Sequence, residues 1–192
     1  MRTSTRERRT KETIITLSLN LDGSGKADID TGVGFFDHML TALTVHSRFD
    51  LSVKCDGDLG VDAHHSVEDV GIVFGQAFAE AIGDKAGIAR YGSFTLPMDE
   101  ALASCHIDIG GRVFTVIDTP FTADRVGELD TQMISEFFRA FANNANITLH
   151  IAALYGDNDH HKAEALFKAF AHALRFAVAR AGDSLLTTKG SL

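Results

Sequence analysis

The stretches Asp62-Ala-His64-His65-Ser-Val-Glu68 and Asn158-Asp-His160-His161-Lys-Ala-Glu164 decide how this sequence is interpreted. The second repeats the His-His-x-x-Glu spacing of the first 96 residues later. An apolar pattern with helical spacing follows each copy, over residues 70–82 and 166–178, and predicts a long helix with one buried face. This repetition indicates that the chain contains two copies of one structural unit.

The repeat continues upstream of both motifs. A helix-like stretch contains His38 in the first half and Glu136 in the second, and a strand-like stretch follows each, over 49–54 and 147–151. Counting back from these strands places His38 opposite Glu136. Farther upstream, alternating runs around glycine-containing turns predict one hairpin in each half. The paired segments are 14–21 with 26–30, and 103–109 with 112–117.

Each half therefore reads as strand-strand-helix-strand-helix. Two such units predict an α+β fold, in which each half forms a four-stranded type of sheet with helices on one face, fused as one compact domain. We place the junction near Gly92, so that residues 1–92 form the first half-repeat and residues 93–192 the second.

Composition excludes several classes of protein. The net charge of −8 makes nucleic acid a poor partner, and no apolar run approaches the ~20 residues of a membrane span. The basic N-terminus lacks the apolar core of a signal peptide. Two cysteines, Cys55 and Cys105, are too few for a disulfide framework. A cytoplasmic location is therefore expected.

The doubled motif predicts metal binding. Residues i and i+4 share one helix face, so His64 with Glu68, and His160 with Glu164, can each chelate one ion. The adjacent histidines, His65 and His161, point about a hundred degrees away, which favours two ions shared between halves or between subunits. The eight candidate ligands are His38, His64, His65, Glu68, Glu136, His160, His161 and Glu164. Imidazole and carboxylate donors without thiolate suit Mn, Fe, Co, Ni or Zn.

The residues alone leave the reaction open. Two ions with free coordination positions favour Lewis-acid chemistry or an activated water, so a metallohydrolase and a metal-dependent lyase both fit. Arg90, Arg112, Lys168 and Lys189 would form a phosphate clamp if they converge. His46 is a candidate for contact with the ligands or the substrate, whereas we interpret His106, His150 and His172 as structural.

The sequence resembles the imidazoleglycerol-phosphate dehydratase family from about Arg8 to Leu192. Four motifs carry the resemblance, in order: Thr31-Gly-Val-Gly-Phe-Phe-Asp-His-Met-Leu40, Asp62-x-His-His-x-x-Glu-Asp69, Asp99-Glu-Ala-Leu102, and Asn158-Asp-His-His-x-x-Glu164 followed by Phe167-Lys168-Ala169. The resemblance implies dehydration of imidazole glycerol phosphate to imidazole acetol phosphate in histidine biosynthesis. It also implies two Mn²⁺ per active site and a homo-oligomer of 24 subunits with sites between subunits.

The resemblance also assigns residues. Family metal ligands fall on His38, His64, His65, Glu68, His160, His161 and Glu164. Substrate contacts fall on Glu12, His46, Arg90, Arg112, Lys168 and the Thr187-Thr188-Lys189 tail. Some family members carry a metal-binding histidine where this chain has Glu136. A carboxylate can also ligate, and the repeat places Glu136 opposite His38, so we keep it as a ligand.

The expected mechanism passes through a metal-bound imidazolate. Ring electrons expel the neighbouring hydroxyl to give a diazafulvene-like species, and loss of a carbon-bound proton then gives an enol that becomes the ketone. A general base and acid are needed. Glu12 is the hypothesis for this proton transfer and His46 the competing candidate. A dinuclear hydrolase of a phosphorylated substrate and a metal-storing shell stay open as alternatives.

Overall fold

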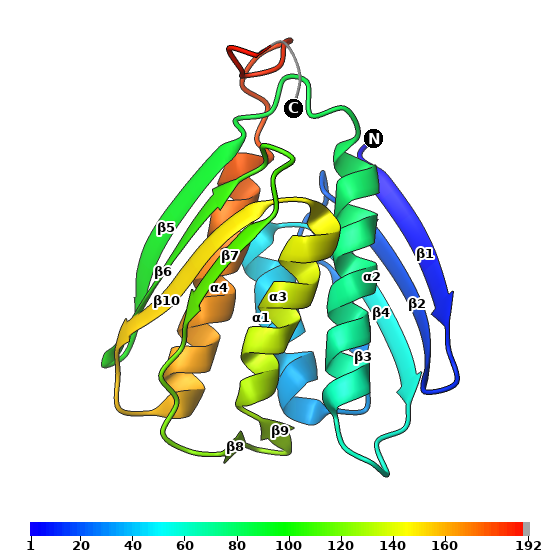
Figure 1. Ribbon diagram of the computed structural model, residues 1–192, viewed down its shortest axis with the longest axis vertical. Coiled ribbons are helices and arrows are strands. Elements are labelled where there is room, and N and C mark those ends of the chain that lie inside the picture. Colours follow the sequence, from blue (N-terminus) through cyan, green and yellow to red (C-terminus); the bar gives the residue numbers. More distant parts are fainter. Residues whose placement is uncertain (190–192) are drawn as a thin grey trace.

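The computed structural model describes residues 1–189 and places four helices between two outer four-stranded sheets (Figure 1). The last three positions of the predicted second half lie outside the described residues. The first sheet has the order β1 (Thr3–Arg9), β2 (Thr13–Asn20), β4 (Asp50–Gly57), β3 (Ala27–Asp30). The second has the order β5 (Tyr91–Met98), β6 (Ala101–Asp108), β10 (Thr148–Tyr155), β7 (Phe114–Asp118). The helices are α1 (Gly34–Ser47), α2 (His64–Ile82), α3 (Gln132–Ala145) and α4 (Asp159–Ala177).

The two-repeat α+β architecture is confirmed, with helices on one face of each sheet. Each four-stranded sheet contains one strand that was not predicted from the sequence, β1 in the first sheet and β5 in the second. The β1 strand reads Thr-Ser-Thr-Arg-Glu-Arg-Arg, a charged run that hides its alternation. The second sheet begins with β5 at Tyr91, so the division predicted at 92/93 falls within this strand.

Both predicted hairpins are wrong. β3 pairs in parallel with β4, with Ile29 opposite Val53, and β7 pairs in parallel with β10. The Asp50 carboxylate at the start of β4 accepts hydrogen bonds from the backbone N–H groups of Ser24, Gly25 and Lys26. These bonds draw the glycine-containing segment across to β4 instead of letting it fold back on β2. The real hairpins are β1–β2 and β5–β6.

The core fills the space between the sheets. Alternate residues of β2 point inward and are almost fully buried, namely Ile15, Leu17 and Leu19. They meet a group of buried phenylalanines on the helices, which are Phe36, Phe74, Phe78, Phe137, Phe138, Phe141, Phe167 and Phe170. Burial on this scale accounts for most of the favourable free energy of folding, and it fixes the helices that carry the predicted ligands.

The helices join the two repeats. α1 of the first repeat packs on α4 of the second, and α2 packs on α3. The α2–α3 contact is close because Gly75 carries no side chain: a Cβ there would lie 2.5 Å from the Phe141 carbonyl oxygen. A small two-stranded sheet, β8 (Arg125–Val126) with β9 (Leu129–Asp130), precedes α3. The first repeat has no such insertion between β3 and α1.

The two motif helices begin at the same end of the molecule, the lower end in Figure 1. The segment between α2 and β5 and the segment that follows α4 lie at the opposite end. Across residues 1–189, no helix combines the length and the apolar character needed to cross a membrane.

Candidate metal and substrate site

Both His-His-x-x-Glu motifs occupy the first turn of a helix. Asn158 caps α4, and its side chain accepts hydrogen bonds from the backbone N–H groups of His160 and His161. In α2 the Asp62 carboxylate accepts from the backbone N–H of His64 at 2.7 Å. Capping of this kind satisfies N–H groups that a helix start leaves unpaired. It therefore fixes the backbone from which the imidazoles project.

One group of ligands is already assembled, and we call it the α1–α4 cluster: His38, His160 and Glu164. One donor atom from each lies within 4.8 Å of the others. The Glu164 Oε2 atom is 3.2 Å from His160 Nε2 and 3.5 Å from His38 Nε2. Among the residues that the structure describes, this is the only set of three such donors found so close together.

Lys168 favours the ionised form of Glu164 in this cluster. Its Nζ atom lies 2.6 Å from Glu164 Oε1, on the carboxylate oxygen that the histidines do not use. Burial by itself would raise the pKa of Glu164, but the hydrogen bond and charge of Lys168, with the charge of His38, outweigh it and lower that pKa. Glu164 is therefore held ionised, as a metal ligand must be.

The equivalent group between α2 and α3 is less closely assembled, and we call it the α2–α3 set: His64, Glu68 and Glu136. His64 Nε2 lies 3.5 Å from Glu68 Oε2. Glu136 occupies the position in α3 that His38 occupies in α1, as the repeat predicted. Its ion-pair partner is Arg139, at 3.6 Å.

The second histidine of each pair faces a different direction. His65 Nδ1 lies 3.0 Å from Asp58 Oδ2, and its Nε2 lies 3.8 Å from Glu12 Oε1. His161 Nδ1 lies 2.7 Å from Glu100 Oε2. The hydrogen bond to Asp58 raises the pKa of His65, and that to Glu100 raises the pKa of His161. That hydrogen bond, together with hydrogen bonds from the backbone N–H groups of Asn158 and Asp157, lowers the pKa of Glu100 to about 2.

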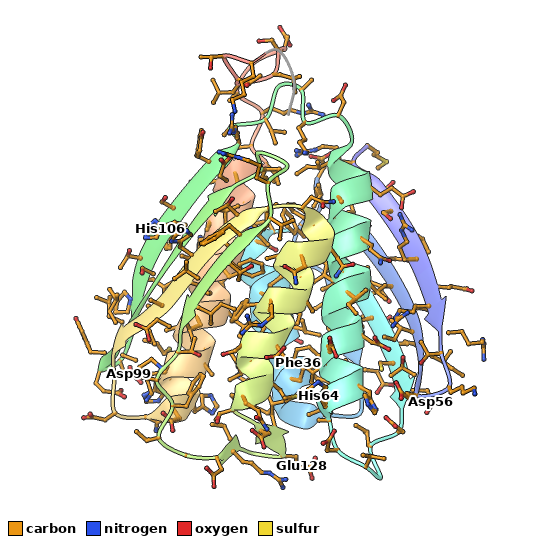
Figure 2. The ribbon with its side chains drawn as sticks, viewed as in Figure 1. Phe36, Asp56, His64, Asp99, His106 and Glu128 are labelled. Carbon is orange, nitrogen blue, oxygen red and sulfur yellow. The ribbon has the colours of Figure 1, made fainter. Side chains whose placement is uncertain are left out.

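These carboxylates orient the rings. A carboxylate on Nδ1 leaves Nε2 as the nitrogen that is presented for binding. Sequence reasoning missed Asp58 and Glu100 in this role. For Glu100 a signal existed in the Asp99-Glu100 motif, whereas Asp58 was one of several acidic residues near α2. Figure 2 shows His64 and Asp99 at the same end of the molecule, with His106 away from them on the second sheet.

The predicted phosphate-binding residues other than Lys168 line a separate cavity of about 710 Å³, which we call the basic cavity. Arg90, Arg112, Thr187, Thr188 and Lys189 belong to its lining. Lys168 does not line this cavity, because its ammonium forms an ion pair with Glu164. The Arg90 guanidinium is largely occupied: it donates to both oxygens of Asp108 at 2.7 and 3.1 Å and to the Leu186 carbonyl at 2.6 Å.

The two predicted proton-transfer candidates lie apart. Glu12 stands beside His65, whereas His46 Nδ1 lies 3.1 Å from His172 Nε2, and His172 stacks on Phe94 with ring centroids 4.2 Å apart. Burial lowers the pKa of His46, and the charge of Lys168 lowers it further. His172, expected to be structural, is thus the direct partner of His46.

The fold and the repeated imidazole–carboxylate site define a class of α+β proteins in which helices of two tandem units pair to form two groups of imidazole and carboxylate side chains. Comparison with known proteins narrows the class. Residues 31–174 match the sequence profile of imidazoleglycerol-phosphate dehydratase. The chain is 56% identical over 192 residues to the imidazoleglycerol-phosphate dehydratase of Methanosarcina barkeri, with 100% of both sequences covered. It is 58% identical over 187 residues to that of Clostridium botulinum, covering 97% of this chain and 96% of the relative.

Solved structures agree with this assignment. The imidazoleglycerol-phosphate dehydratase of Staphylococcus aureus superposes with a TM-score of 0.85 at 40% identity, over 93% of this chain and 99% of that one. The enzyme of Pyrococcus furiosus, solved in complex with (S)-C348, gives 0.85 at 33% identity over 97% and 100% of the two chains. The chain therefore belongs to the imidazoleglycerol-phosphate dehydratase family, and it is an enzyme, a hydro-lyase.

Proposed function

We propose that the enzyme dehydrates imidazole glycerol phosphate to imidazole acetol phosphate in histidine biosynthesis, with two Mn²⁺ ions in each active site. The α1–α4 cluster is the observation that supports metal use most directly, since three donors lie within 4.8 Å of one another. Its donors are imidazole nitrogen and carboxylate oxygen, which suit Mn²⁺. The thiols lie elsewhere: Cys105 is buried in β6 and Cys55 lies in β4.

The proposed division of ligands follows the geometry. His38, His160 and Glu164 would hold one ion, and His64, Glu68 and Glu136 the other. His65 and His161, whose Nε2 atoms lie 3.8 Å from Glu12 Oε1 and 3.5 Å from Asp99 Oδ2, would each complete a site on a neighbouring copy. When bound, the ions would supply Lewis acidity that makes the imidazole ring of the substrate easier to deprotonate.

The separation of the two sites along α4 supports sharing between subunits. The α1–α4 cluster lies at the start of α4, whereas the backbone N–H of Arg90 donates to the carbonyl of Ala177 at its end. About sixteen residues at 1.5 Å per residue separate them by roughly 24 Å. A small phosphorylated imidazole is too short to span this distance. We therefore propose that a basic cavity of one copy serves the metal ligands of another, within an assembly of 24 subunits.

The residues of the chain would act as follows. Arg112, Thr188 and Lys189 would hold the phosphate in the basic cavity, and Arg90 would position the tail through the Leu186 carbonyl. Lys168 would keep the Glu164 carboxylate ionised, with substrate contact added in the assembly. Glu12, with no hydrogen bond from its side chain to another described group, would move the proton, and His46 is the other candidate.

We also propose that the reaction takes place in the cytoplasm. Both cysteines are free thiols, which fits a reducing compartment.

The decisive experiment is turnover by metal-stripped enzyme with and without added metal. We expect imidazole acetol phosphate to form from imidazole glycerol phosphate when Mn²⁺ is restored, with no release of inorganic phosphate. Release of phosphate would identify a hydrolase, and metal uptake without turnover would identify a storage shell. Either outcome would contradict the proposal.

A further inference from the structure

Phe35 stands against the α1–α4 cluster although sequence reasoning gave it no role. It precedes His38 by three residues in α1, so the two side chains share one helix face. Its ring meets the ring of His160 edge-on, with centroids 5.0 Å apart and an interplanar angle of 64°. The ring of His38 lies 6.3 Å away at 60°. Phe35 therefore contacts histidines on two helices from different repeats.

The three rings form one group, because the His38 and His160 centroids are themselves 5.7 Å apart. An imidazole on a helix surface turns freely about its side-chain bonds unless neighbours stop it. Edge-to-face contact with an aromatic ring favours particular ring planes. In the observed planes, the Nε2 atoms of both histidines lie near the same oxygen, Oε2 of Glu164.

On its other side, Phe35 lies close to the turn between β8 and β9. A Cβ added at Gly127, in the turn between β8 and β9, would lie 3.4 Å from the Cβ of Phe35. Gly127 has φ +60°, a conformation that favours glycine. The β8–β9 insertion, which the first repeat lacks, thus lies close to the Cβ of Phe35. Figure 2 shows Glu128 of this turn beneath the helices.

The other half of the molecule provides an internal comparison. The repeat places Met133 where Phe35 stands, and Met133 lines a cavity with His64. Methionine is flexible and offers no ring plane. The α2–α3 set, which has the methionine, lacks the close grouping of three donors that the α1–α4 cluster shows within the described residues.

We infer that Phe35 is a positioning residue of the α1–α4 cluster, whose ring holds the imidazoles of His38 and His160 in the orientation that binds the ion. The inference rests on the proposed metal dependence. It predicts that removing the aromatic ring weakens metal binding at this cluster and leaves the α2–α3 set unchanged.

The test is a Mn²⁺ titration of metal-stripped protein, in which the electron paramagnetic resonance signal of free Mn²⁺ reports binding. F35L is combined with each of two other substitutions. E68Q disables the α2–α3 set, so that binding reports on the α1–α4 cluster. E164Q disables the α1–α4 cluster, so that binding reports on the α2–α3 set. We expect F35L to weaken binding about tenfold in the E68Q background, as changes behind metal ligands typically do, and to have no effect in the E164Q background.

Two further variants separate positioning from folding. F35Y keeps the ring and should retain binding within about twofold of E68Q alone. F114L removes an exposed phenylalanine at the start of β7, beside His150 of the second sheet, and should leave binding unchanged. Circular dichroism and thermal melting check that each variant is folded.

Unchanged binding by F35L in the E68Q background would overturn the inference, as would equal weakening in both backgrounds. These results are distinct from failure of the proposed function. Wild-type protein that binds Mn²⁺ but forms no imidazole acetol phosphate contradicts the proposed reaction alone. Wild-type protein that binds no Mn²⁺ contradicts both.

Discussion

The two oxygens of Glu164 have different partners, and this division shows how single residues are arranged here. Oε2 faces the two imidazoles of the α1–α4 cluster, while Oε1 receives the ammonium of Lys168. The paired histidines follow the same principle. His65 and His161 each use Nδ1 for a carboxylate and leave Nε2 for binding. At this scale, function depends on which atom of a side chain is already engaged.

Glu12 provides the first residue-scale prediction. Glu12→Gln should lower turnover by roughly 10²–10⁴-fold, the usual contribution of a general acid or base. Metal content, measured by elemental analysis, should stay the same because Glu12 is assigned to proton transfer and not to the ions. Glu7→Gln on the exposed face of β1 is the matched control and should be fully active. Full turnover by Glu12→Gln, with loss of turnover in His46→Gln, would transfer the role to His46.

At the scale of elements, helix contacts decide which ligands meet. α1 brings His38 to α4, and α3 brings Glu136 toward α2. Both contacts cross between the repeats, so neither half can assemble its ligands by itself. The α2–α3 contact depends on close backbone approach, since a Cβ at Gly75 would lie 2.5 Å from the Phe141 carbonyl oxygen and 2.9 Å from the Ala145 nitrogen.

Gly75→Ala should therefore destabilise the protein. Alanine favours a helix by about 1 kcal/mol over glycine, but the backbone of α3 must move to admit the methyl group, and overpacking costs roughly 1–3 kcal/mol. With atoms this close we expect the upper end of that range and a melting temperature several degrees lower. Gly34→Ala, where no atom lies within 4 Å of the added Cβ, is the control. Equal melting temperatures for both variants would contradict the account.

For the whole molecule, the main feature is that the proposed metal ligands and the basic cavity lie at opposite ends. If these residues form the active site proposed above, one chain contains its parts without bringing them together. His65 and His161 present partly exposed rings, with 34% and 26% of their side-chain surfaces accessible. If neighbouring copies supply these rings to the ions, metal binding and assembly are coupled.

Removal of metal should then dissociate the assembly. Size-exclusion chromatography with light scattering should show a smaller species after chelation and a return to the original mass on adding Mn²⁺. His65→Ala should dissociate even in the presence of metal, whereas His106→Ala, on the exposed side of β6, should not. Chelated protein that keeps its full mass would show that the metals serve chemistry alone.

The sequence by itself determined the repeated unit, the long motif helices, the correspondence of His38 with Glu136 and the divergence of adjacent histidines. These features follow from local periodicity, since 3.6 residues per turn fixes which neighbours share a helix face. The resemblance to the family then assigned Glu12, His46 and the basic residues to roles.

Only the tertiary structure decided which segments meet. Strand pairing is non-local, so the sequence pattern could not show that β3 would pair in parallel with β4. The hydrogen bonds of Asp50 to the segment before β3 favour this pairing. Nor could local pattern show that Phe35 of α1 would lie against His160 of α4. Such contacts depend on how helices from different repeats pack on a common core, and no spacing along the chain encodes that arrangement.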